Sequence, residues 1–162
     1  MSQCIVLTIG YGNRSSEEFI SLLKYHHSQY LIDVRSKPFS RQKEFNRDSL
    51  KTLLKANGIK YIFMGDLLGG KPDDSFYYNS GRVDYNILKE QPFFRKGIKR
   101  IKDACEEGFQ IVLMCAESKP QNCHRSKLLG EELLKLKIDV KHIDENGVVI
   151  GQDAISERLN KG

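Results

Sequence analysis

The side chains best suited to chemistry lie in one short segment, IVLMCAESKPQNCHRSKLLGEELLK, which runs from Ile111 to Lys135. Four apolar residues lead directly into a group of reactive and charged residues: Cys115, Glu117, Cys123, His124 and Arg125. A thiol with an adjacent imidazole can act as a nucleophile with its own proton acceptor, and a guanidinium binds phosphate or carboxylate. The segment therefore predicts a site where Cys115 or Cys123, helped by His124, meets an anionic substrate.

The same segment is expected to lead into a helix that is capped by Asn122. A helix N-terminus offers free N–H groups and a partial positive charge, which favour a bound anion and lower the pKa of a nearby thiol. Arg125 in the first turn would oppose the helix dipole, and this indicates an anion near it.

Two other interpretations of these residues stay open. A cysteine at the edge of an apolar strand is more often a small core residue than a nucleophile, which applies to Cys115. A metal site built from Cys115, Glu117, Cys123 and His124 is an alternative, although the spacing Cys-x7-Cys-His matches no common structural zinc pattern.

The elements that position these residues follow from short apolar runs separated by amphipathic segments. The runs are rich in β-branched and aromatic residues and predict strands at 4–9, 30–34, 60–64, 110–115 and 139–143. Helical patterns lie between them at 17–27, 47–58, 92–108 and 122–137, and a final helix is expected within 151–162. The chain is therefore expected to form a single three-layer α/β domain over 1–162, with a mostly parallel sheet of about five strands and helices on both faces.

Polar residues collect where the predicted strands end, which is where open parallel sheets bind their ligands. Tyr11 and Asn13 follow the first strand, Asp33 and Arg35 end the second, and the pair Gly69 and Gly70 follows the third. We expect Tyr11, Asn13, Arg35, Gly69, Gly70 and Arg125 to bind substrate. Asp33 is predicted to orient Arg35 or to act as a general base, although a structural ion pair is equally consistent with their spacing.

The segment 65–91 mixes Gly, Pro, Asp and Tyr without a clear period and is long for a connection. It indicates a functional loop or lid more than a second domain.

Composition sets broad limits. The chain has 162 residues, a net charge of +5 and four cysteines. Without an apolar leader at its start, it is expected to be cytoplasmic, with free or metal-bound thiols in place of a disulfide framework; Cys4 and Cys105 are expected in the core and on a helix. No membrane-spanning segment is expected, and no cofactor is identified.

Four stretches, in this order and spacing, resemble the family catalogued as domain of unknown function 488, DUF488: LTIGYGNRSSEEFISLL, LIDVRSKPFSRQKEFN, GIKYIFMGDLLGG and VLMCAESKPQNCHRSKLLGEEL. The resemblance covers about Thr8 to Ile143 and implies a fold and a set of positions to test, without a reaction. Where the family usually has a histidine and a serine in its first loop, this chain has Tyr11 and Gly12. A fainter likeness links the architecture to rhodaneses and cysteine phosphatases, but the first arginine after Cys115 is Arg125, beyond the reach of their shorter loop.

Three functional hypotheses follow. The leading one is an enzyme of unassigned reaction whose substrate is a nucleotide, a nucleic acid or another phosphate-bearing molecule, with Asp33, Cys115, Glu117, Cys123 and His124 as catalytic candidates. The second is the metal-dependent alternative. The third is a non-catalytic nucleic-acid-binding module, supported only by the net charge and the arginines at positions 14, 35, 41, 47 and 125.

Overall fold

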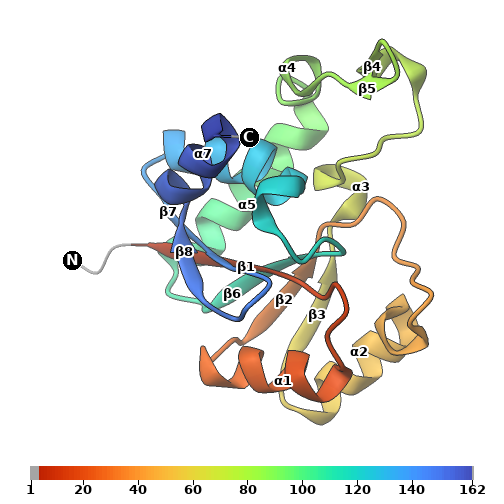
Figure 1. Cartoon of the computed structure of the whole chain (residues 1–162), viewed down its shortest axis with the longest axis vertical. Coiled ribbons are helices and arrows are strands. Elements are labelled where there is room, and N and C mark those ends of the chain that lie inside the picture. Colours follow the sequence, from red (N-terminus) through yellow and green to blue (C-terminus); the bar gives the residue numbers. More distant parts are fainter. Residues whose placement is uncertain (1–3, 162) are drawn as a thin grey trace.

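A six-stranded, mostly parallel sheet forms the centre of the computed structural model, which describes residues 4–161 (Figure 1). The strands are ordered β3-β2-β6-β1-β7-β8 across the sheet. Their bounds are Ile5–Gly10 (β1), Tyr30–Asp33 (β2), Lys60–Phe63 (β3), Ile111–Cys115 (β6), Asp139–Ile143 (β7) and Val149–Gly151 (β8). All pairs are parallel except β7 with β8, which is antiparallel.

Helices cover both faces of this sheet, because its central strand is apolar on both sides. All five residues of β6 are buried. Val112 and Met114 pack with the first two helices, α1 (Ser16–Tyr25) and α2 (Arg47–Ala56), whereas Leu113 packs on the opposite face. That second face is covered by α5 (Pro92–Glu106), by a π-helical segment η4 (Arg125–Gly130) that continues into α6 (Glu131–Lys135), and by α7 (Gln152–Lys161) (Figure 1). The predicted α/β fold is thus confirmed, and β8 adds a sixth strand.

The helix starts follow the sequence in two places and depart from it in one. Ser15 caps α1 by accepting a hydrogen bond from the Glu18 N–H at 3.1 Å. Asn46 precedes α2, as the pattern predicts. The prediction for Asn122 was wrong: it ends a short 3₁₀ turn, η3 (Pro120–Asn122), and the following helix starts at His124 and Arg125. Pro120, the first residue of this turn, favours its formation because its ring fixes the backbone φ angle.

The segment between β3 and α5 contains several short elements. They are α3 (Gly65–Leu68), the turn η2 (Ser75–Tyr77), a small hairpin of β4 (Tyr78–Asn79) and β5 (Arg82–Val83), and α4 (Tyr85–Leu88). Figure 1 shows the hairpin extending away from the sheet, on the side of its α5 face. Leu68 and Leu88 are buried in the core, so both ends of this segment are anchored to the domain.

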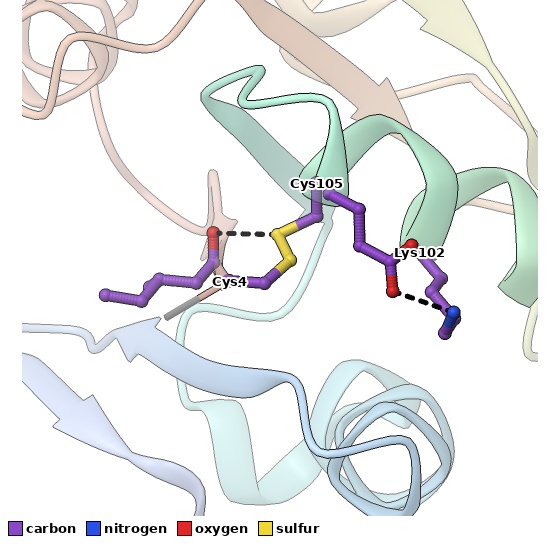
Figure 2. The surroundings of a disulfide bond; sticks show 5 residues. Cys4, Lys102 and Cys105 are labelled. Atoms are coloured by element: carbon purple, nitrogen blue, oxygen red, sulfur yellow. Dashed lines mark hydrogen bonds and ion pairs between the residues drawn. A yellow bond between two sulfur atoms is a disulfide. The ribbon is translucent and has the colours of Figure 1, made fainter. Parts of the chain in front are cut away.

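The expectation of four free or metal-bound cysteines was wrong for one pair. Cys4, directly before β1, forms a disulfide with Cys105 in the last turn of α5, and their Cα atoms are 5.7 Å apart (Figure 2). This distance lies within the range that a disulfide spans. The two residues are separated by 101 positions in the sequence, so only the packing of α5 beside the start of β1 brings them together. Cys115 and Cys123 are free.

Within residues 4–161, no helix is both long and apolar enough to cross a membrane.

Candidate active site

An open cleft lies at the carboxyl ends of the neighbouring strands β2 and β6. Its volume is about 900 Å³, which is within the range of small-molecule sites. One wall comes from residues 35–37 and 39, another from residues 115–117 and 122–124, and a third from residues 70–73, 75, 78 and 85. The cleft therefore joins the two strand ends that the sequence singled out with part of the segment 65–91.

Cys123 and His124 form a thiol–imidazole pair in this cleft. The Cys123 sulfur lies 3.5 Å from His124 Nδ1, and His124 Nε2 lies 3.0 Å from the Val34 carbonyl oxygen. A carbonyl oxygen can only accept, so Nε2 carries the hydrogen and the neutral ring presents a lone pair at Nδ1. Burial lowers the pKa of His124, which keeps the ring neutral. His124 can therefore accept the proton of Cys123.

The environment of Cys123 favours its thiolate. Burial alone would raise its pKa, but a hydrogen bond with the Cys115 thiol, the Arg125 backbone N–H and the Arg125 charge together lower it. Cys115 behaves in the opposite way, since burial and the neighbouring Cys123 raise its pKa well above the usual value. Of the two thiols, Cys123 is the nucleophile candidate, and Cys115 stays neutral and donates to the Glu117 carbonyl oxygen.

Arg125 lies beneath the loop that joins the two cysteines and is fully buried. Its guanidinium donates to the carbonyl oxygens of Glu117 at 3.3 Å and Ser118 at 2.9 Å, to Thr8 Oγ1 at 2.8 Å and to the Ile143 carbonyl at 3.2 Å. It does not line the cleft. Its predicted contact with a substrate anion is therefore not supported by this placement, and its side chain holds the loop instead.

Thr8 extends this contact into a buried polar chain. Thr8 Oγ1 lies 2.6 Å from His142 Nδ1, and His142 Nε2 lies 2.5 Å from Gln152 Oε1. The Gln152 amide donates to the Ser126 carbonyl at 3.0 Å and to Glu131 Oε1 at 2.9 Å. Burial lowers the pKa of His142 to about 4. The chain ties β1, β7 and α7 to the start of the helix that carries the site, and no feature of the sequence indicated it.

Asp33 and Arg35 form a buried ion pair at the end of β2. Arg35 Nε and one terminal nitrogen donate to the two Asp33 oxygens at 2.9 and 2.8 Å, and the other terminal nitrogen donates to the Phe45 carbonyl at 2.8 Å. Tyr61 also donates to Asp33, at 2.6 Å, and burial followed by this bond raises the pKa of Tyr61. Asp33 is fully buried and does not line the cleft, so its geometry favours the role of orienting Arg35 over that of a base.

The remaining predicted residues separate into two groups. Gly70 and Glu117 line the cleft, and Gly69 lines a smaller cavity beside it. A Cβ on Gly70 would lie 2.6 Å from the His124 ring, so glycine permits the imidazole to sit against this turn. Tyr11 is buried and stacks on Phe45 at 4.5 Å between ring centroids, and Asn13 is exposed; neither lines the cleft.

The metal alternative is not supported by this geometry. Among the described residues, no three His, Cys, Asp or Glu side chains gather closely enough to hold one ion. The Glu117 side chain is exposed, while its carbonyl oxygen faces Cys115 and Arg125.

Several cleft residues were not foreseen, namely Ser36, Lys37, Phe39, Lys71, Asp73 and Ser75. The first three directly follow Arg35, so their position after a predicted strand was the available signal.

The family model described as domain of unknown function DUF488 matches residues 15–131. The chain belongs to the DUF488 family. The match includes both strand ends that form the cleft and all four of Cys115, Glu117, Cys123 and His124. It begins after Tyr11 and Gly12, the positions where the first-loop residues of the family were expected. No curated protein and no solved structure matches the chain.

Proposed function

We propose that this DUF488 protein is an enzyme that uses Cys123 as a thiolate nucleophile on a phosphate-bearing small molecule, such as a nucleotide, bound in the cleft. The observation that carries the proposal is the pair formed by the Cys123 sulfur and His124 Nδ1 at 3.5 Å, two residues that line a cleft of ligand size. In this proposal the Cys123 proton passes to His124, the sulfur forms a bond to the electrophilic atom, and the leaving group departs with its electron pair and recovers the proton.

The buried charge of Arg125 supports a thiolate at this position. Among the described residues, no carboxylate lies within ion-pair distance of Arg125; its partners are a hydroxyl and three carbonyl oxygens. A buried cation without a counter-ion is costly and stabilises a nearby negative charge. The Cys123 thiolate supplies that charge, and its pKa falls in response.

The walls of the cleft support an anionic substrate. Arg35, Lys37 and Lys71 all line it. The Lys37 contact with Asp73 is long, at 3.9 Å, and highly exposed, so it competes only weakly with a bound phosphate. Two of the five arginines that favoured a nucleic-acid module, Arg14 and Arg125, are buried and do not line the cleft. A small phosphate-bearing ligand fits the geometry better.

Alkylation of the folded protein tests the nucleophile. The rate of Cys123 modification by iodoacetamide, followed by mass spectrometry between pH 5 and 10, should reach half its maximum below the usual thiol value of about 8.5. Inorganic pyrophosphate and adenosine monophosphate should slow this reaction. Protection of Cys123 until the protein unfolds would refute the proposal.

Lysine variants test the anion site separately. The double variant Lys37→Gln/Lys71→Gln should be alkylated as fast as the parent but should lose the protection by both phosphate compounds. Lys51→Gln, on the exposed face of α2, serves as the matched control and should keep the protection. If the double variant is protected as well as the control, the lysines do not bind the anion and this part of the proposal fails.

A further inference from the structure

The second thiol of the cleft has no part in the reaction described so far. Cys115 ends β6 and is 2% exposed, yet it lines the same cleft as Cys123. Its sulfur lies 3.5 Å from the Glu117 carbonyl oxygen. Cys115 and Cys123 belong to the same buried cluster on this face of the sheet, and both line the one cleft.

The loop that connects Cys115 to Cys123 is fixed by hydrogen bonds at both ends. Arg125 fixes it from beneath through the carbonyl oxygens of Glu117 and Ser118. At the far end, the Cys123 N–H donates to the Pro120 carbonyl oxygen at 3.2 Å, and the Ser126 hydroxyl donates to the same oxygen at 2.5 Å. Both ends of the loop are therefore tied to the helix start, and both thiols line the same cleft within one braced structure.

We propose that Cys115 and Cys123 form a reversible redox pair, in which Cys115 resolves an oxidised Cys123 into a Cys115–Cys123 disulfide. The oxidant is a hydroperoxide: the Cys123 thiolate attacks its terminal oxygen, the O–O bond breaks, and an alcohol or water leaves after taking a proton. Cys115 sulfur then attacks the sulfenic sulfur, an S–S bond forms, the S–O bond breaks, and the hydroxide leaves as water with the Cys115 proton.

The net change is two thiols and one hydroperoxide giving a disulfide, an alcohol and water, and an external dithiol reverses it. Closure needs the two sulfur atoms to approach across the cleft that both cysteines line and to form a bond of about 2.05 Å. The inference rests on the proposed function through the reactivity of Cys123. Its consequence is control of that function, because the disulfide removes the nucleophile from the cleft and also shields it from further oxidation.

The test uses reduced, desalted full-length protein treated with one equivalent of hydrogen peroxide and then blocked with N-ethylmaleimide. Cleavage after glutamate separates the two thiols, because Glu117 lies between them, and releases peptides 108–117 and 118–131. These peptides should be found joined without reduction, and should separate after dithiothreitol. Iodoacetamide labelling of Cys123 should fall more than tenfold on oxidation and return on reduction.

The variant Cys115→Ala supplies the control: one equivalent of peroxide should leave Cys123 as an unresolved sulfenic acid, and two further equivalents should convert it to sulfinic and sulfonic acids. The same digest of protein that was neither reduced nor oxidised should contain the Cys4–Cys105 linkage, which shows that disulfides survive the procedure. If Cys123 is alkylated rapidly but the peroxide-treated peptides never join, the redox pair is refuted and the nucleophile stands. If Cys123 neither alkylates nor oxidises in the folded protein, both proposals fail.

Discussion

The two pairs of cysteines lie at opposite edges of the same sheet and differ in state. Cys4 and Cys105 meet at the amino edge, where β1 begins, and are closed into a disulfide. Cys115 lies at the carboxyl edge, in register with Gly10 at the end of β1, and together with Cys123 it lines the cleft as a free thiol. The first pair joins two distant segments, and the second lies beside a base and a buried cation.

The comparison teaches that surroundings, and not residue type, decide what a thiol does in this fold. The Cys105 sulfur, which is in the disulfide, lies 3.6 Å from the Ile5 carbonyl oxygen, a group that cannot stabilise a negative charge. Near Cys123 there are a donor thiol, a backbone N–H, an imidazole and the Arg125 charge. Only the second environment stabilises a thiolate.

Removing the buried charge of Arg125 should have the largest effect, both on stability and on the ionisation of Cys123. Arg125→Met leaves the Thr8 hydroxyl and three buried carbonyl oxygens without their donor, so we expect the free energy of unfolding in urea to fall by about 3–5 kcal/mol. The pH of half-maximal Cys123 alkylation should also rise. Arg100→Met, at an exposed position of α5, is the control and should change stability by less than about 0.5 kcal/mol. Equal stabilities for the two variants would mean that other contacts hold the loop.

Removing the disulfide should lower the stability of the protein and leave the reactivity of Cys123 unchanged. The double variant Cys4→Ala/Cys105→Ala loses a link across 101 positions, so its free energy of unfolding should fall by roughly 2–4 kcal/mol. The rate of Cys123 alkylation in the folded protein should stay the same, because the link lies at the opposite edge of the sheet. A changed rate would show that the two edges are coupled.

Lowering the pH should destabilise the folded protein without any mutation, by somewhat less than removal of the disulfide. In the folded protein the pKa of His142 is about 4, whereas in the unfolded chain it is about 6.5. The unfolded state therefore binds a proton that the folded state does not, and stability should decline as pH falls from about 6.5 to about 4, by up to roughly 3 kcal/mol. His124, whose pKa burial also lowers, contributes in the same direction.

Urea unfolding at a series of pH values measures this decline. His142→Gln should flatten it in part, and His27→Asn, at an exposed position, should leave it unchanged. A decline of the same size in both variants would assign the acid sensitivity to groups other than His142.

Much of the fold was predictable because its signals are local. Apolar runs located five strands within a residue or two, and the helical pattern at 17–27 located the start of α1 within one residue. The strand β8 was missed because its three residues show no pattern of their own and pair only with β7. In the site, the adjacency of Cys123 and His124 was visible directly, whereas the choice of Cys123 over Cys115 as nucleophile needed the positions of their neighbours.

By itself, the sequence determined which residues form strands and helices and that its reactive side chains follow strand ends, because these depend on neighbours along the chain. The tertiary structure decided which cysteines pair, which arginine lines the cleft and which holds the loop, and which thiol is poised to ionise. Those outcomes depend on burial and on charges brought together from distant segments. Arg125 shows the difference most clearly: its type predicted an anion contact, and its complete burial beside Thr8 and two loop carbonyls made it a brace.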